Sequence, residues 1–388
     1  MLRSQVRIAQ ESIAHRLPLI YSGHEHCSKA CIIVGGGGTM TKQKLILLFD
    51  GTWNDPEDQT NVYRITRLIH DDDDGIRQRF YYNPGVGTSK FQRFTGGAFG
   101  HGLSTNLQEG YDWLARRYSE GDEIWIFGFS RGAYTARSLV GMIRKCGLVH
   151  VVTPGLLDKA ESIYRNRDLH PDSEVCTGFK ESFSLQPRIH FIGVWDTVGA
   201  LGVPGTNLFK SKYDWHDTEL SSIVDHAYQA VALDEHRATY NVSLWTSKDG
   251  KQKTGNRDVE QCWFIGAHAN VGGGYGADDT LADISLSWML AKAQKAGLKV
   301  APYEVAEDAW KTAPKDSFSD FLRGFYARYK RLGNTSDGRF YRQYAEVMPG
   351  QCAVNISVDE SVWKRWADTT CEYRPRTLTD VPLFPPEE

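Results

Sequence analysis

Residues 122–137 read DEIWIFGFSRGAYTAR, and they carry the clearest structural signal in the chain. The apolar run that ends at Gly128 has the composition of a buried strand, and the residues after Ser130 suit a helix. A Gly-x-Ser-x-Gly motif in that context is typical of a nucleophile elbow, a sharp turn that holds the serine in strained backbone geometry. Gly128 and Gly132 fit such a turn because they bring no side chain that would clash there. We therefore interpret Ser130 as a nucleophile; the alternative is an ordinary strand-to-helix turn with a serine cap.

Two patterns alternate on both sides of this turn. Short apolar runs without regular polar alternation predict strands that are covered on both faces, and they span residues 44–49, 79–82, 123–127, 188–195 and 261–265. Amphipathic patterns predict helices over residues 103–118, 133–146, 218–233 and 281–296. This order predicts an α/β fold with a mostly parallel sheet and helices on both faces.

The chain is long enough for one large domain with insertions, and we expect residues 44–388 to form it. Residues 1–43 are expected to be a flexible extension, because four consecutive glycines precede the first predicted strand. After about residue 300 the alternation is lost, and we expect that part to be a cap or a peripheral subregion of the same domain.

The composition excludes several classes of protein. The 45 basic and 48 acidic residues give a net charge of −3, so no strong field favours binding to nucleic acid. Seven scattered cysteines indicate reduced thiols rather than a disulfide framework, and no apolar run approaches the length of a membrane-spanning helix. These features predict a cytoplasmic protein, although arginines at 3, 7 and 16 faintly resemble a mitochondrial presequence. The sequence does not indicate an oligomeric state.

Asp196 is the candidate acid. A serine nucleophile needs a base, and the base needs a carboxylate that fixes its tautomer. In folds with a nucleophile elbow these residues follow the serine in the order acid, then histidine. Asp196 ends the predicted strand over residues 188–195, and sites in α/β sheets form where strands end. The alternative is that Asp196 only caps the following turn.

His268 is the candidate base. It follows the predicted strand over residues 261–265 and precedes a glycine-rich segment, so we expect it on a mobile loop at the same edge of the sheet. The competing histidines fit less well. His190 lies inside a predicted strand, His226 inside a predicted helix, and His236 beside acidic residues that explain it by local pairing.

Backbone amides are the candidates for holding the oxyanion that forms during acyl transfer. The amide of Arg131, at the start of the predicted helix, is the expected first donor. The second donor in such folds comes from a loop after an earlier strand, and here Gly51 or Thr52 would provide it. The alternative is that Asp50 and Thr52 only organise this turn. Chemistry of this kind requires no metal or organic cofactor.

These motifs resemble the α/β-hydrolase family of formerly unknown function, found in bacteria and fungi, that includes the phospholipase effectors of type VI secretion. The resemblance covers about residues 44–300. Its motifs are FDGTWN (49–54), TNV (60–62), YNPGVGT (82–88), GFSRGAY (128–134), GVWDTVG (193–199), ALDEHR (232–237) and HANVGGGY (268–275), with YRP (373–375) as a further match.

The resemblance implies an α/β-hydrolase-like fold, the same Ser130, Asp196 and His268 triad, and hydrolysis of ester bonds in glycerophospholipids. A lipid or a small ester is then the substrate, with contact to a membrane surface but no transmembrane segment. Family members often carry Asp two residues after the histidine, whereas this chain has Asn270. The resemblance is compatible with delivery as a secreted effector or with a standalone esterase or lipase.

Three other interpretations fit parts of the sequence. Asp50 in the sequence FDGT could be the nucleophile of a phosphatase that needs Mg²⁺, but the paired carboxylate two residues away is missing because that position is Leu48. A hydrolase scaffold without activity could serve as a binding protein. Histidines 24 and 26 with cysteines 27 and 31 have the types of zinc ligands but no common zinc-site spacing, so no metal site is expected.

Overall fold

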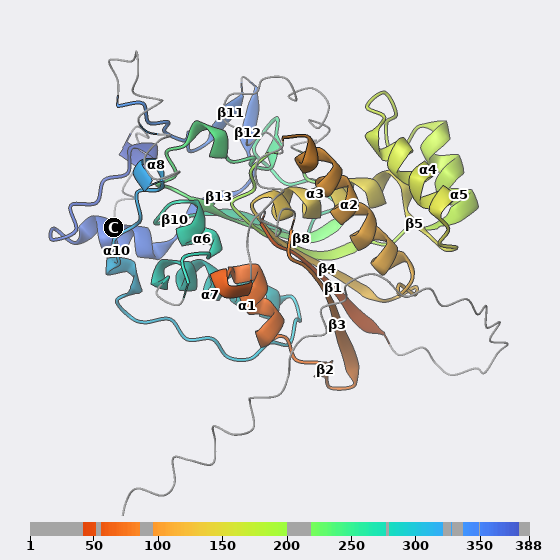
Figure 1. Ribbon diagram of the computed structural model, residues 1–388, viewed down its shortest axis with the longest axis horizontal. Coiled ribbons are helices and arrows are strands. Elements are labelled where there is room, and N and C mark those ends of the chain that lie inside the picture. The colour runs from red at the N-terminus through yellow and green to blue at the C-terminus, as the bar shows by residue number, and fades with distance from the viewer. Residues whose placement is uncertain are drawn as a thin grey trace, which may run out of the picture. The chain divides into compact units, whose positions relative to one another are not determined.

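The computed structural model of the protein describes residues 42–51, 56–85, 96–199, 219–276, 279–320, 327, 337–348 and 350–379. Its central feature is an eight-stranded sheet with the order β13-β10-β8-β7-β4-β1-β3-β2 (Figure 1). All neighbouring strands pair in parallel except β2 with β3. The strands are β1 (Gln43–Phe49), β2 (Asp72–Asp73), β3 (Ile76–Asn83), β4 (Glu123–Phe129), β7 (Ile189–Trp195), β8 (Val224–Ala232), β10 (Asp258–Phe264) and β13 (Ile356–Val358). The predicted α/β fold with a mostly parallel sheet is confirmed.

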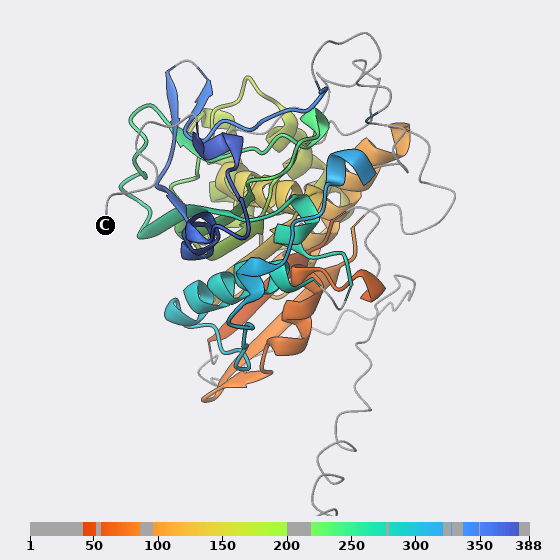
Figure 2. The same ribbon diagram turned by 90° about the vertical axis from the view of Figure 1, so that its left-hand side faces the viewer.

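Helices cover both faces of the sheet because its strands are apolar on both sides. Along β1, Leu45 and Leu47 join one buried cluster while Ile46 and Leu48 join the other, as the two-residue period of a strand requires. The first cluster also contains residues of α2 (Gly96–Ala115), α3 (Arg131–Cys146), α4 (Pro154–Arg165) and α5 (Glu174–Phe183). The second contains residues of α1 (Asn61–Leu68) and α7 (Thr280–Lys295), and the two layers can be followed in Figures 1 and 2.

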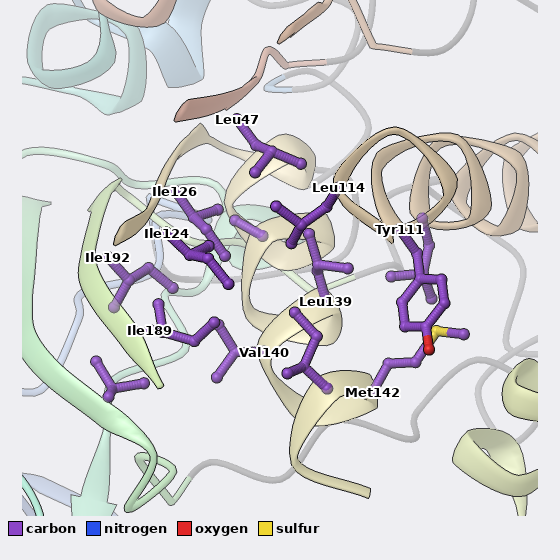
Figure 3. Packing of buried hydrophobic residues seen from close by; sticks show 14 of the residues in the cluster. Leu47, Tyr111, Leu114, Ile124, Ile126, Leu139, Val140, Met142, Ile189 and Ile192 are labelled. Atoms are coloured by element: carbon purple, nitrogen blue, oxygen red, sulfur yellow. The ribbon is translucent and has the colours of Figure 1, made fainter. Parts of the chain in front are cut away.

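The first cluster anchors α3, the helix that begins after Ser130. Leu139 and Val140 of α3 pack with Ile126 of β4 and Ile192 of β7, and all four side chains are buried (Figure 3). Burying an aliphatic side chain of this size contributes about 1.5–3 kcal/mol. The helix is therefore held firmly against the two strands that end beside its first turn.

One expected helix is wrong. Residues 218–233 were expected to be helical, but the structure has strand β8 there, paired in parallel with β7 and β10. Every residue of β8 except His226 is buried, so helical and strand periodicity could not be told apart from the apolar pattern. His226 accordingly lies in a strand and not in a helix.

The part after residue 300 also contributes to the sheet, through β13, which pairs with β10. Its side chains Val362, Tyr373 and Leu378 complete a third buried cluster that includes Trp263 of β10. Whether this part also caps the site stays a prediction, and the expected extension over residues 1–43 lies almost entirely outside the described residues.

The remaining elements are β5 (Leu148–Val149), β6 (Ser184–Leu185), β9 (Thr246–Ser247), β11 (Glu346–Met348), β12 (Gln351–Ala353), α6 (His268–Gly272), α8 (Ser317–Asp320), α10 (Glu360–Ala367), α11 (Arg376–Thr379), η1 (Pro56–Asp58), η4 (Ala238–Tyr240) and η5 (Ala309–Lys311). In the described part of the chain, no helix combines the length and the apolar character needed to cross a membrane.

Candidate active site

Ser130 occupies a sharp turn between β4 and α3. Its backbone has φ 58° and ψ −120°, which a residue with a side chain rarely adopts, and its amide donates to the carbonyl of Trp195 at 3.0 Å. The two flanking glycines leave no room for a side chain. A Cβ on Gly132 would lie 2.1 Å from the carbonyl oxygen of Phe49, and one on Gly128 would lie 2.7 Å from Cα of Ala133. The turn therefore exists in the form that the motif predicts, with its serine at the carboxyl end of a central strand.

Asp196 follows the neighbouring strand β7 and is fully buried. Its backbone also has positive φ, at 40°, and its amide donates to the carbonyl of Ala230 at 2.8 Å. The carboxylate oxygen Oδ1 accepts a hydrogen bond from the amide of Ala232 at 3.0 Å. The end of β8 therefore fixes the carboxylate beside the end of β7.

His268 is the first residue of the short helix α6 and not part of an open loop as expected. Its Nδ1 lies 2.6 Å from Oδ2 of Asp196, and its Nε2 lies 2.8 Å from Oγ of Ser130. A carboxylate accepts hydrogen bonds, so Nδ1 carries the proton and Nε2 accepts from the serine hydroxyl. The structure thus brings together the three side chains that the sequence suggested, in the order that a serine nucleophile and its base require.

Aromatic rings hold the imidazole of His268 from two sides. The ring of Phe129 lies 4.7 Å from it and the ring of Tyr240 lies 5.0 Å from it, edge to face. The guanidinium of Arg237 in turn sits 3.6 Å from the centroid of Tyr240. These contacts leave His268 nearly inaccessible, with 7% of its side chain exposed.

Burial lowers the pKa of His268 below its ordinary value of 6.5, although the hydrogen bond and the charge of Asp196 oppose that effect. The imidazole is therefore neutral at neutral pH, which is the form that can accept a proton. For Asp196, burial acts to raise the pKa, but the charge of Arg342 and the hydrogen bonds from His268 and Arg342 more than offset it and hold the pKa well below its usual range. The acid is ionised beside a neutral base.

The sequence patterns did not single out Arg342, yet it contacts the candidate acid directly. Its two terminal nitrogens donate to the two oxygens of Asp196, at 2.6 and 2.9 Å. Arg342 lies in the part of the chain where no motif was recognised, so only a contact in three dimensions reveals it.

Glu235 also contacts the site and was part of a motif to which no role was given. Its carboxylate forms a buried ion pair with Arg237, with distances of 2.8 and 2.7 Å. It also accepts hydrogen bonds from the backbone amide of His268 at 3.3 Å and from the hydroxyl of Ser317 at 3.0 Å. The motif ALDEHR therefore supports the start of α6, from which the imidazole extends.

Asn270, two residues after His268, stabilises the same helix. Its Oδ1 accepts from the amides of Ala267 at 3.2 Å and Lys315 at 3.1 Å, and its Nδ2 faces Oδ1 of Asp279 at 3.4 Å. Burial raises the pKa of Asp279 to about 6, although the amide of Asn270 opposes this. An amide suits this position because it both accepts from the backbone and donates to a carboxylate, whereas a second carboxylate would repel the first.

Two of the candidate oxyanion donors, Arg131 and Gly51, lie within the described residues. Arg131 begins α3, so its amide belongs to the helix terminus that favours negative charge. The amide of Gly51 donates to Oδ1 of its neighbour Asp50 at 2.7 Å, and Thr52 lies outside the described residues. The other oxygen of Asp50 accepts from Thr60 at 2.6 Å and Tyr82 at 2.8 Å. The Asp50 carboxylate thus connects the end of β1 to the start of α1 and to β3.

Two of the competing histidines have other hydrogen-bond partners. Nε2 of His190 lies 2.9 Å from the carbonyl of Ala296, and Nδ1 of His236 lies 3.2 Å from the carbonyl of Phe340. The cluster of histidines and cysteines at 24–31 lies outside the described residues. Across the part that is described, no three side chains of the His, Cys, Asp or Glu type gather as metal ligands would.

Comparison with known proteins gives relatives of this chain. It is 30% identical over 230 residues to an uncharacterized protein of Saccharomyces cerevisiae, a match that covers 53% of this chain and 33% of the yeast protein. An uncharacterized protein from Pseudomonas aeruginosa has a similar structure with a TM-score of 0.46 and 19% identity, over 70% of this chain and 50% of that one. The Tle1 effector, solved bound to the VgrG spike of the type VI secretion system, gives a TM-score of 0.46 and 16% identity, over 77% and 83% of the two chains.

A family model matches much more specifically. The model describes the catalytic domain of Tle1-like phospholipase effectors of type VI secretion, and it matches residues 43–292. This range contains β1, the elbow at Ser130, Asp196 and His268, and it is more than half of the chain. The chain spans only a third of the length of the yeast relative, so its family, rather than the activity of any whole relative, follows from the comparisons. The chain belongs to the family of Tle1-like catalytic domains of type VI secretion phospholipase effectors.

Proposed function

We propose that this protein is a serine hydrolase that cleaves carboxylic esters of lipids, with Ser130 as nucleophile, His268 as general base and acid, and Asp196 as the supporting carboxylate. The observation that carries the proposal is the chain of two short contacts, 2.8 Å from Ser130 to His268 and 2.6 Å from His268 to Asp196. Ser130 follows β4, Asp196 follows β7 and His268 begins α6, so residues far apart in the chain meet in this order. An activated nucleophile requires this arrangement.

The reaction proceeds in two acyl transfers. Oγ of Ser130 attacks the ester carbonyl carbon while its proton passes to Nε2 of His268. The tetrahedral intermediate collapses, the bond from the acyl carbon to the alcohol oxygen breaks, and His268 returns the proton to that oxygen. Water then attacks the acyl carbon and gives a proton to His268. The bond from that carbon to Oγ of Ser130 breaks, His268 returns the proton to Oγ, and the carboxylic acid leaves. Asp196 remains ionised throughout and holds the imidazolium in place.

Backbone amides stabilise the negative charge of the intermediate. Arg131 supplies the first, because its amide lies at the start of α3 beside the nucleophile. Gly51 or Thr52 supplies the second; for Gly51, the hydrogen bond to Asp50 at 2.7 Å has to be shared or exchanged when substrate binds. Each donor of this kind lowers the barrier by about 2.7–4 kcal/mol. No metal or organic cofactor takes part in these steps.

Phospholipids are the substrate class that the family match supports, since the matching model describes the catalytic domain of phospholipase effectors. The substrate would reach the site at a lipid surface, either in the cytoplasm or after delivery as a secreted effector. A binding protein built on the same fold remains the competing proposal. We further propose that residues 44–388 form a single catalytic domain.

The decisive experiment combines covalent labelling with a substrate panel. A fluorophosphonate probe is expected to label the wild-type protein, and p-nitrophenyl esters and phospholipid vesicles are expected to be hydrolysed. Ser130→Ala should abolish both while its thermal unfolding stays close to that of the wild type. Ser138→Ala removes another buried hydroxyl, from α3, and serves as the matched control that keeps labelling and turnover. A folded wild-type protein that stays unlabelled would instead support the binding protein.

A further inference from the structure

Arg342 reaches the candidate site from a distant part of the chain, 50 residues beyond the region that the family model matches. Neither Arg342 nor Asp196 has any exposed side-chain surface. Besides the two oxygens of Asp196, the guanidinium donates to the carbonyl of Ala232 at 2.7 Å and to the carbonyl of Tyr240. A fully buried cation with four acceptors is expensive to place, because both charges of the pair lose their hydration.

We propose that Arg342 is a positioning residue of the active site, which aims the carboxylate of Asp196 at His268 and keeps it ionised. The proposal rests on the proposed function, because it assumes that Asp196 supports His268 in catalysis. It assigns a role in the reaction to the C-terminal part of the chain, which was expected to be a cap or a peripheral subregion.

The contacts of Arg342 determine the orientation of the Asp196 carboxylate. Its two terminal nitrogens bind one oxygen each, and this fork restricts rotation of the carboxylate about its Cβ–Cγ bond. With that rotation restricted, Oδ2 stays 2.6 Å from Nδ1 of His268. The carbonyls of Ala232 and Tyr240 fix the guanidinium itself, and the ring of Tyr240 packs on the imidazole. Arg342 therefore links the acid to two of the segments that surround the base.

Arg342 also balances the charges at the site. The charged groups that face His268 and its partner are Asp196 after β7, Glu235 and Arg237 after β8, and Arg342 itself. Removing the charge of Arg342 would favour protonation of Asp196 and would also let the carboxylate draw a proton more strongly onto His268. Both effects would lower the activity, since activity requires an ionised acid and a neutral base.

The test measures the rate of fluorophosphonate labelling against pH for Arg342→Met and Arg342→Lys. This readout depends on Ser130 and its base but not on the identity of the natural substrate. For Arg342→Met, we expect labelling at pH 7 to slow by about 10²-fold, as for a displaced catalytic group. In its pH profile, the acid limb, where labelling falls as the pH is lowered, should also move to higher pH by about one unit or more. Arg342→Lys keeps a cation but not the fork, so we expect it to fold, to label more slowly than the wild type and to show a smaller shift.

Arg339→Met is the matched control. Arg339 lies three residues away and pairs with Asp316, so its loss disturbs the same segment without touching Asp196. Its pH profile should coincide with that of the wild type.

The outcomes separate a positioning role from a merely structural one. If Arg342 only stabilised the fold, a smaller fraction of each variant would label, but the pH dependence of the labelling rate would be that of the wild type. That result, or Arg342 variants that label like the wild type, would overturn the inference. If Arg342→Met does not fold, Arg342→Lys decides by the same two readouts. Failure of the wild-type protein to label would overturn the proposed function instead.

Discussion

The protonation of His268 depends on a close balance of charges around it and its partner. Two carboxylates, Asp196 and Glu235, lie beside two guanidinium groups, Arg237 and Arg342, and each acid is bound by one of them. Each pair therefore cancels much of its own charge, and burial becomes the largest influence on the imidazole. Burial disfavours the charged form, which keeps the base ready to accept a proton.

This balance predicts the pH dependence of the wild-type protein. The pKa of His268 is lowered from 6.5, so the neutral, active imidazole persists below that pH. Labelling and ester turnover should fall as the pH drops through the lowered pKa, and the midpoint of this acid limb should lie below pH 6.5. The measurement is the rate of fluorophosphonate labelling between pH 4.5 and 8, with thermal unfolding recorded at each pH. A midpoint above pH 6.5 in folded protein would contradict the burial argument.

Among single residues, the sequence predicted the site residues that directly follow strands. It did not predict the residue that contacts them from a distant segment of the chain. Ser130 and Asp196 each end an apolar run that could be recognised as a strand, so their convergence followed from the parallel sheet. Arg342 lies in the unpatterned part of the chain, where arginines are ordinarily exposed. Only the tertiary contact with Asp196 distinguishes it from its neighbours.

Among the elements, α3 and β1 impose a strict steric limit. The first turn of α3 passes so near the end of β1 that a Cβ on Gly132 would lie 2.1 Å from the carbonyl oxygen of Phe49 and 2.4 Å from that of Asp50. This approach fixes the elbow relative to the loop that starts at Asp50, where the second oxyanion donor is proposed. A close backbone approach of this kind admits only glycine.

Gly132→Ala should therefore damage both the fold and the site. The added Cβ would lie 2.1 Å from the carbonyl oxygen of Phe49, and backbone atoms cannot move aside as a flexible side chain can. We expect a loss of about 3 kcal/mol or more in unfolding free energy, measured by urea denaturation, together with loss of labelling. Gly155→Ala is the control, because a Cβ there meets nothing within 4 Å; it should be neutral or slightly stabilising. Equal stability of the two variants would show that the elbow is less tightly packed than described.

Sequence patterns predicted most of the central strands but not β8. The strands at the centre of the sheet were recognised because their apolar runs are short and are followed by turn residues. Strand β8 was expected to be a helix, because residues 224–232 are buried on both faces and mix Ala, Tyr and Gln with Val. The segment mixes apolar residues with polar ones such as Asp225 and Gln229, so its pattern did not indicate a strand, and its pairing with β7 and β10 decides the outcome.

At the scale of the whole molecule, the sheet extends beyond the region by which the family is recognised. The match ends at residue 292, yet β13 forms the edge of the sheet beside β10. Val362 and Leu378 are fully buried against the cluster that contains Val231 and Trp263. Without these later residues, the apolar side chains at the ends of β8 and β10 would face water.

A chain that stops at residue 300 should consequently fail to form a stable site. It would expose the buried side chains of Val231, Leu233 and Trp263 and would remove Arg342 from Asp196. A buried carboxylate that loses its cation costs about 3–5 kcal/mol, which is a large part of the stability of a typical domain. We expect the shortened chain to unfold without a cooperative transition and to resist fluorophosphonate labelling, whereas full-length Arg342→Lys should retain the cooperative transition. A shortened chain that unfolds cooperatively and labels at the wild-type rate would place the whole catalytic apparatus before residue 300.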